Sequence, residues 1–353
     1  MADTLATARS VPPGPIGPDF EPAALDAWLR ARLPSLAGPL TLEPATGGMS
    51  NPTFFLTVGD RRLVLRKKPS VQLSSAAHRI DREYRLLQAL TESDVPVPAP
   101  VLYCEDETVV GTPFYVMERL EGVVSRDYAL PGLAAGARGR AYGHLAETLA
   151  ALHRFDWKAA GLADFGKPGN YFERQLAGWS RQWRQFGISD NPDVDRLQAW
   201  LGAHMADDDG CATIAHGDFR MANVMFRPDG TVAGVFDWEL ATIGHPMADL
   251  AFCLQGWFLG PDENGGVAGL DLPAMGIPGA REFVGRYFAA APAMPPLGAF
   301  HIAFAMYRAA VGASSVALRA DAGAAADPAA AADARRYARA YARAGLHAIE
   351  NWD

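Results

Sequence analysis

The pattern of hydrophobic and polar positions divides the chain into a strand-rich first third and a mainly helical remainder. Two β-prone runs, Thr53–Val58 and Arg62–Lys67, flank the dipeptide Gly59-Asp60, and together they predict a β-hairpin. The segment Arg79–Leu90 carries apolar residues at helical spacing and predicts an amphipathic helix. A further strand pair is expected to end at Phe114–Met117. These elements predict a small sheet with one associated helix.

Beyond this sheet the chain is predicted to be mostly helical. A helix core face repeats at Tyr142, Leu145, Leu149 and Leu152, and the Ala- and Arg-rich segment Ala329–Ile349 predicts a last helix. A β-prone island at 213–236 interrupts the helices and turns at 228–230. We expect a flexible leader at 1–18, preceding a short helix, then an N-terminal lobe at 19–118 and a C-terminal lobe at 119–353.

Composition and charge narrow the function classes. The 353 residues are 49% hydrophobic and carry a net charge of −8, which argues against a nucleic acid or an anionic membrane as partner. The longest apolar segment, around 300–318, is interrupted by Arg308 and predicts a buried helix rather than a membrane span. Three widely spaced cysteines predict free thiols in a reducing compartment, so we expect a cytoplasmic protein. The oligomeric state stays open.

The most informative stretch is His216–Asn223, followed by Asp237-Trp238-Glu239. Within it, Asp218 precedes Asn223 by five residues, and Asp237 ends a β-prone segment nineteen residues after Asp218. Phosphoryl transfer needs a carboxylate to orient the attacking hydroxyl, and hard oxygen ligands to hold Mg²⁺ against the phosphates. The spacing matches the H-R-D-x-x-x-x-N and D-F-G patterns of protein kinases, and therefore predicts a kinase-type site.

These motifs resemble the aminoglycoside phosphotransferase family, which includes choline and homoserine kinases, and most closely its kinase-like members associated with acyl-CoA dehydrogenases. The resemblance covers residues 47 to 256. It implies an α+β, bilobed, protein-kinase-like fold, with ATP and Mg²⁺ as cofactors. It also implies the site residues: Asp218 as catalytic base, Asn223 and Asp237 as Mg²⁺ ligands, Glu239 as a further acid at the metal, and Asp249 as a structural anchor beneath the catalytic loop. His216 is expected to brace this loop.

The nucleotide-binding residues are expected in the N-terminal lobe. Ser50, in the Gly-rich stretch Thr46–Asn51, is expected near the phosphates, although the same stretch suits a plain hairpin turn. Arg66 stands where the family usually has lysine, and Glu83 is its expected partner, with a solvated helix acid as the alternative. Strand alternation puts Arg66 and Lys68 on one face and Lys67 on the other. The backbone from Glu118 through Leu120 is expected to contact adenine.

The acceptor site is less clearly marked. In Asn170–Gly187, Trp179 and Trp183 lie four residues apart, beside a stripe formed by Arg174, Arg181 and Arg184. Trp257 and Phe258 follow the metal region. This basic stretch suggests an anionic acceptor, and our hypothesis is a hydroxylated acyl-CoA. The alternative is that the tryptophans are core residues and the arginines are solvated. Histidines without metal-ligand spacing argue against a zinc site.

We therefore expect an ATP-dependent small-molecule kinase that phosphorylates an acceptor hydroxyl. A five-stranded antiparallel sheet with one key helix would pack over a helical lobe, with ATP in the cleft between them. A nucleotide-binding pseudokinase with a regulatory role is the alternative, and Arg66 is its best support. A protein kinase is less consistent with the sequence, because little chain separates Asp237 from Asp249 for an activation loop.

Overall fold

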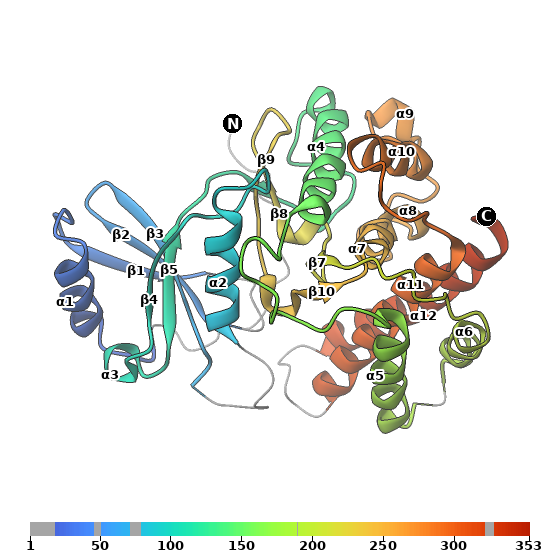
Figure 1. Ribbon diagram of the computed structural model, residues 1–353, viewed down its shortest axis with the longest axis horizontal. Coiled ribbons are helices and arrows are strands. Elements are labelled where there is room, and N and C mark those ends of the chain that lie inside the picture. Colours follow the sequence, from blue (N-terminus) through green and yellow to red (C-terminus); the bar gives the residue numbers. More distant parts are fainter. Residues whose placement is uncertain (1–17, 46–50, 71–78, 189, 322–327) are drawn as a thin grey trace.

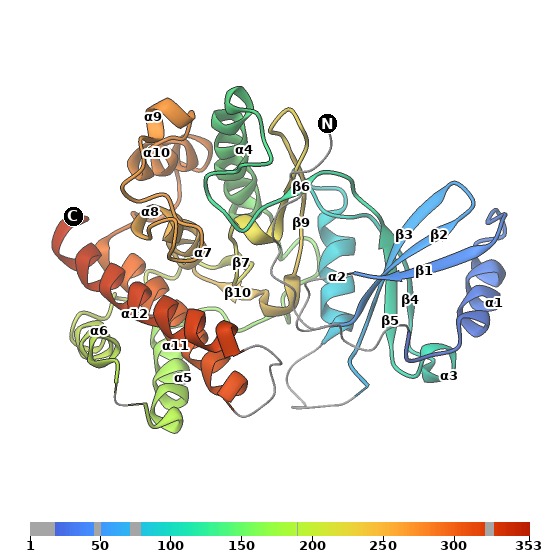
Figure 2. The ribbon, with the colours of Figure 1, turned by 180° about the vertical axis from the view of Figure 1, so that it is seen from behind.

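The structure, a computed structural model, describes residues 18–45, 51–70, 79–188, 190–321 and 328–353. A twisted sheet with its helices forms one end of the molecule, and a larger helical body forms the other (Figures 1 and 2). The predicted leader lies outside the described residues, except for Pro18. The expected bilobed α+β arrangement is present.

The small sheet has five antiparallel strands in the order β1-β2-β3-β5-β4. The strands are β1 (Leu40–Pro44), β2 (Thr53–Val58), β3 (Arg61–Lys67), β4 (Pro100–Cys104) and β5 (Phe114–Glu118). The predicted β2–β3 hairpin is confirmed, and Gly59 in its turn has a φ of +59°. A Cβ atom there would lie 2.3 Å from the Ala37 carbonyl oxygen, so this position requires glycine.

The two faces of the sheet pack against different parts of the molecule. On one face, Leu56, Leu63 and Leu65 join a small core with α1 (Pro22–Arg32) and α3 (Glu107–Val110). On the other face, Val64 and Tyr115 belong to the main core together with α2 (Ile80–Leu90). Because residues alternate along a strand, one sheet serves both cores. The small lobe therefore packs against the helical body through an apolar surface.

Lys67 points to the face opposite Arg66, as alternation predicts. Its side chain is fully buried, its Nζ lies 2.6 Å from Asp19 Oδ1, and it also lies 5.2 Å from the ring centroid of Phe20. Burial alone would raise the pKa of Asp19, but the hydrogen bonds from Lys67 and Ser70 together with the charge of Lys67 outweigh it, and the pKa falls below its usual value. The residues ahead of α1 are therefore held against the sheet by an ion pair between the buried Lys67 and the exposed Asp19.

The larger body contains a short sheet framework and most of the helices. The helices are α4 (Ala135–Arg154), α5 (Tyr171–Phe186), α6 (Pro192–Ala203), α7 (Pro246–Cys253), α8 (Gln255–Phe258), α9 (Leu272–Met275), α10 (Ala280–Ala290), α11 (Ala299–Arg319) and α12 (Pro328–Asn351). The strands form a sheet β6 (Val123–Val124)-β8 (Val224–Phe226)-β9 (Val232–Val235) and a pair β7 (Thr213–Ala215)-β10 (Thr242–Gly244). The helix expected near Ala329–Ile349 is confirmed as α12.

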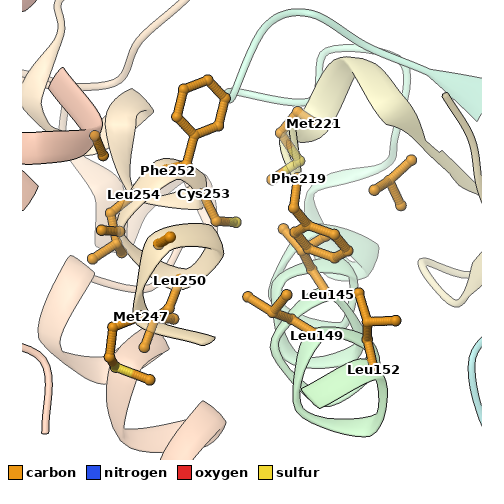
Figure 3. Close-up of a cluster of buried hydrophobic side chains, with 14 of the residues drawn as sticks. Leu145, Leu149, Leu152, Phe219, Met221, Met247, Leu250, Phe252, Cys253 and Leu254 are labelled. Carbon is orange, nitrogen blue, oxygen red and sulfur yellow. The ribbon is translucent and has the colours of Figure 1, made fainter. Parts of the chain in front are cut away.

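The core of this body supports the loop that carries the predicted catalytic motif. Leu145, Leu149 and Leu152 line one face of α4, as their spacing predicts, and all three are fully buried. Figure 3 shows them facing Phe219 of the loop, with α7 on the other side. The loop residues Phe219 and Met221 are themselves fully buried. The loop is therefore fixed by packing as well as by hydrogen bonds.

Candidate active site

The candidate site is built where two strands of the larger body end. The catalytic loop follows β7 and contains the short 3-10 helix η1 (Met221–Asn223) before β8 begins. Asp237 follows β9 and precedes the 3-10 helix η2 (Trp238–Leu240). The Phe236 amide donates to the Asn223 carbonyl oxygen at 2.9 Å, which ties the two segments together. Residues far apart in the motif are thus brought to one place.

Asp249 on α7 anchors the catalytic loop from below. Its side chain is fully buried and accepts hydrogen bonds from the backbone amides of His216 at 2.5 Å and Gly217 at 2.9 Å. Burial alone would raise the pKa of Asp249, but the neighbouring His153 and His216 together with the Gly217 amide bring the pKa below its usual value. The predicted anchor is therefore present as a buried carboxylate.

His216 braces the loop, as expected. Its Nε2 lies 2.8 Å from the carbonyl oxygen of Phe236, and its Nδ1 accepts a hydrogen bond from the Asp218 amide at 3.1 Å. A carbonyl can only accept, so Nε2 carries the proton and the ring is the neutral tautomer. Both ring nitrogens are engaged with the backbone, and the ring is fully buried. This geometry suits a brace and leaves no nitrogen for proton transfer.

Asp218 is held by two neighbours in its own motif. Asn223 Nδ2 donates to Asp218 Oδ2 at 2.7 Å and to its carbonyl oxygen at 2.8 Å. Arg220 Nε lies 3.1 Å from the Asp218 carboxylate, whose side chain is 19% exposed. Arg220 was not among the residues expected from sequence, although it lies inside the quoted motif. The carboxylate is oriented by two donors while it still reaches solvent.

Asp237 has a left-handed backbone, with φ 64° and ψ 58°, which is uncommon for a residue other than glycine. Such a conformation is costly and concentrates at functional sites. Asp237 Oδ1 accepts a hydrogen bond from Arg66 Nη2 at 2.8 Å, and the same nitrogen lies 3.7 Å from Glu239 Oε2. Arg66 on β3 therefore joins the small sheet to the acidic end of β9.

The predicted partner of Arg66 is confirmed. Arg66 Nε lies 2.9 Å from Glu83 Oε2 on α2, and the Glu83 side chain is 2% exposed. Glu83 also accepts hydrogen bonds from Asn51 Nδ2 at 2.8 Å and from the Tyr115 hydroxyl at 3.1 Å. Burial raises the pKa of Glu83 to about 7 in spite of the opposing charge of Arg66. The alternative of a solvated helix acid is therefore wrong.

The other residues expected to contact the nucleotide are Ser50, Glu118 and Leu120. Ser50 lies outside the described residues. The Glu118 amide donates to the Ala99 carbonyl oxygen at 2.9 Å, and its carboxylate pairs with the exposed Arg61. Within the described chain, no backbone hydrogen bond involves Leu120. Contact of Glu118 or Leu120 with adenine stays a prediction.

The donor set fits a hard divalent cation. The side-chain nitrogen of Asn223 donates hydrogen bonds to Asp218, so the side-chain oxygen of Asn223 is the atom available to bind a ligand. Asp237 supplies a carboxylate beside it, and Glu239 follows on η2. Carboxylate and amide oxygens suit Mg²⁺. Within the described residues, this site included, no group of three or more His, Cys, Asp or Glu residues is arranged to hold a metal ion, so the Asn223 oxygen is a necessary member of the donor set.

The expected acceptor residues on α5 divide into core and surface. Trp183 is 3% exposed, and its Nε1 donates to Asp195 Oδ1 at 2.7 Å, while Trp179 is half-buried. Arg174, Arg181 and Arg184 are all exposed. The alternative is therefore confirmed for Trp183 as a core residue and for the arginines as solvated, whereas Trp179 is only partly buried against the core. No helix in the described residues is long and apolar enough to cross a membrane.

Comparisons with known proteins identify the family. The profile of the "Phosphotransferase enzyme family" matches residues 41–300. The chain is 38% identical over 292 residues to mouse acyl-CoA dehydrogenase family member 10, matching 81% of this chain and 27% of that protein. It is 41% identical over 244 residues to chicken acyl-CoA dehydrogenase family member 11, matching 68% of this chain and 31% of that protein. The chain thus spans less than a third of the length of these relatives.

Solved structures agree on the fold. A crystal structure of a candidate aminoglycoside phosphotransferase from Ralstonia eutropha is 38% identical, with a TM-score of 0.84 over 94% of this chain and 98% of that one. Aminoglycoside phosphotransferase APH(4)-Ia, solved with AMP-PNP and hygromycin B, is 20% identical with a TM-score of 0.60, over 91% of this chain and 99% of that one, which speaks to the fold alone. The chain therefore belongs to the phosphotransferase enzyme family and has its protein-kinase-like fold.

Proposed function

We propose that this chain transfers the γ-phosphoryl group of ATP to a hydroxyl group on a small molecule. The observation that carries the proposal is the convergence of Asp218, Asn223 and Asp237 at one place, next to the buried Arg66–Glu83 pair. Phosphoryl transfer is catalysed mainly by positioning and charge stabilisation, which is what this arrangement offers. The lobes at 19–118 and 119–353 would divide the work between nucleotide and acceptor.

Asp218 is proposed as the catalytic base. Its carboxylate is fixed by Asn223 and Arg220, so one oxygen can accept the proton of the acceptor hydroxyl without first rearranging. Arg220 would also place a positive charge beside the phosphoryl group as it moves to the acceptor oxygen. Asp249 and His216 hold the loop that carries both residues. Asp249 and His216 are therefore positioning residues that do not contact the substrate.

Arg66 is proposed to bind phosphate oxygens while Glu83 fixes its position, and Asn51 and Tyr115 in turn hold Glu83. Ser50 and the backbone at Glu118 and Leu120 are proposed as further nucleotide contacts. Mg²⁺, when held by Asn223 and Asp237 with Glu239 nearby, would neutralise charge on the phosphates. Arg66 reaches Asp237 across the two lobes, so nucleotide binding requires it to exchange this carboxylate for phosphate oxygens.

For the acceptor we propose a hydroxylated acyl-CoA. The proposal is supported by the relatives named for acyl-CoA dehydrogenases, in which a segment similar to this chain accompanies further sequence. A cytoplasmic location is proposed with it. A pseudokinase is not favoured, because the acid, amide and metal-site residues are all retained and converge. The departure at Arg66 does not weaken this reading, since its guanidinium makes the expected pair with Glu83.

The test is ADP release from Mg²⁺-ATP against a panel of acceptors. The panel holds 4-hydroxyacyl-CoAs, choline, homoserine, aminoglycosides and sugars, with Asp218→Asn as the matched control. We expect ADP release that depends on a hydroxyacyl-CoA and falls by about 10²- to 10⁴-fold in the variant. Release with a free amino alcohol but not with the thioesters would reject the proposed acceptor. A near-normal rate for Asp218→Asn would reject the assigned base.

A further inference from the structure

Arg308 is a charged residue in the middle of the apolar helix α11. Its side chain and backbone together are only 8% exposed. Arginine is rarely buried to this extent without a partner. Yet among the described residues no hydrogen bond and no ion pair involves the Arg308 side chain, whose guanidinium lies near two aromatic rings. A buried cation without a counter-charge in the protein needs a physical explanation.

The two rings hold the guanidinium in a fixed place. Its central carbon lies 4.6 Å from the ring centroid of Phe252 on α7 and 5.9 Å from that of Trp179 on α5. Aromatic rings engage the flat face of a guanidinium and leave the N–H groups at its edge unused. Three helices that are separate in sequence thus meet around one positive charge.

The guanidinium nitrogens also reach solvent. The fully enclosed nitrogens that make no hydrogen bond within the described chain are Trp28 Nε1, Arg66 Nε, Arg138 Nε and His153 Nε2. No nitrogen of Arg308 is in this group, so the small exposed part of the residue includes its donors. The residue is mostly buried, and its charged end keeps some contact with solvent. A ligand can therefore approach the donors that the protein leaves unpaired.

This charge lies in the layer that supports the catalytic loop. Phe252 follows Asp249 by three residues on α7, and Asp249 binds the backbone amide of Gly217, next to Asp218. In Figure 3 the Phe252 ring extends from the end of α7 that lies level with Met221 of the loop. Tyr171, at the start of α5, has a pKa that burial raises to about 12 and that the charges of both Arg308 and Asp249 influence. Arg308 therefore packs against α7, the same helix whose Asp249 holds the loop that carries Asp218.

Three other arginines of the larger body differ in having carboxylate partners. Arg220 pairs with Asp218, Arg343 with Glu263, and Arg339 with Asp190. These three pairs need no charge from outside the protein. Arg308 is flanked instead by two apolar rings. The matching charge would have to come with a ligand.

We propose that Arg308 is the anion-binding residue of the acceptor site, and that the acceptor carries a carboxylate or phosphate group in addition to its reacting hydroxyl. This inference rests on the proposed phosphotransfer function. It also moves the anion site from the exposed arginines of α5 to one buried residue of α11. A hydroxylated acyl-CoA meets the requirement through its phosphates, and a hydroxy acid meets it through its carboxylate.

Binding is measured without turnover. The wild-type protein, saturated with Mg²⁺–AMP-PNP to fill the nucleotide site, is titrated with inorganic phosphate and separately with acetate at constant ionic strength. Tryptophan fluorescence reports binding, because Trp179 lies over the guanidinium. We expect saturable binding that is at least tenfold weaker in Arg308→Met and intermediate in Arg308→Lys. Arg184→Met, which removes an exposed arginine on α5, should bind as the wild type does.

Tighter phosphate binding would assign a phosphate-bearing acceptor, and tighter acetate binding a carboxylate. No saturable binding of either anion to the wild type would overturn the proposal. So would an unchanged titration in a folded Arg308→Met protein, or an equal loss in Arg184→Met. If Arg308→Met does not fold, the wild type and Arg308→Lys still decide the question. Asp218→Asn should keep anion binding, so a failure of phosphotransfer alone would contradict the proposed function and not this site.

Discussion

Arg66 Nη2 lies 2.8 Å from Asp237 Oδ1, so a cation from the small sheet directly meets the acid that ends β9 in the larger body. The same guanidinium also pairs with Glu83 on α2 at 2.9 Å. One side chain therefore links a strand, a helix and the acid proposed as a metal ligand. Because Arg offers several donors in a fixed fork, it can hold both acids at once, which a lysine ammonium does with less directional control.

Replacing Arg66 should show how much the free energy of unfolding falls when the buried Glu83 loses its cation. Arg66→Met leaves Glu83 enclosed and unpaired, and we expect a loss of about 3 kcal/mol in the free energy of unfolding. Arg66→Lys keeps the charge and should lose less. Urea denaturation measures both, with Arg61→Met as the control, because Arg61 on the same strand is exposed. Equal losses for Arg66→Met and Arg61→Met would show that the pair contributes nothing.

Asp237→Ala should remove the effect of Mg²⁺ on nucleotide binding. The variant lacks the carboxylate that ends β9, and we expect its Kd for Mg²⁺-ATP to rise about a hundredfold. This rise corresponds to about 2.7 kcal/mol less ligand stabilisation. Thermal unfolding with ATP, in the presence of Mg²⁺ or of a chelator, makes the comparison. Asp229→Ala, in an exposed turn, is the control. A Mg²⁺-dependent shift that survives in Asp237→Ala would exclude it as a ligand.

Asp249→Asn should loosen the catalytic loop. The carboxylate accepts two backbone amides with two oxygens, and asparagine has only one acceptor oxygen to offer them. A buried amide would lose its partner, and we expect about 2–3 kcal/mol less stability. Turnover should fall while nucleotide affinity is largely kept, because Asp249 touches the loop rather than the nucleotide. Stability and kcat equal to the wild type would show that the loop does not depend on this anchor.

His301 should make the protein sensitive to acid. Burial, helped by the nearby His245, lowers the pKa of His301 to about 4, whereas an unfolded histidine titrates near 6.5. The folded state binds the proton less readily than the unfolded state, so the free energy of unfolding has its full value, as far as His301 is concerned, above about pH 6.5. The free energy of unfolding falls by an amount on the order of 2–3 kcal/mol as the pH drops toward 4.

His301→Asn should flatten this acid slope, because asparagine can still accept the hydrogen bond that the Gly298 amide donates to His301 Nδ1 at 3.0 Å. Urea unfolding at several pH values between 4 and 7 provides the measurement. His347→Asn, at an exposed position on α12, should retain the slope of the wild type. A slope that persists in His301→Asn would assign the acid sensitivity to another group.

The sequence was informative wherever a local pattern and its partner lie close in the chain. The β2–β3 hairpin was predictable because alternation and the turn dipeptide occur together, and alternation also separated Arg66 from Lys67. The spacing of Asp218 and Asn223 was predictable because one short loop carries both. The Arg66–Glu83 pair followed from the family resemblance, and the structure confirms its geometry.

Features that depend on distant packing were not predictable in this way. Arg308 looked like an interruption in an apolar helix, because nothing in its own segment indicates that Phe252 and Trp179 surround it. The exposed arginines of α5 looked more suitable for an anion because they form a regular stripe. β10 was missed because its three residues pair with β7, almost thirty positions earlier, and not with a neighbour. Such partners are set by the whole fold.

The ion pair between the buried Lys67 and the exposed Asp19 bears on how far the chain can be shortened from its N-terminal side. Deleting the chain up to Glu21 would remove no residue of α1 or of the sheet. It would, however, leave the buried ammonium group of Lys67, at the end of β3, without its carboxylate partner. A trimmed protein should therefore begin no later than Pro18. Any tag or cleavage site is better added ahead of that residue than next to α1.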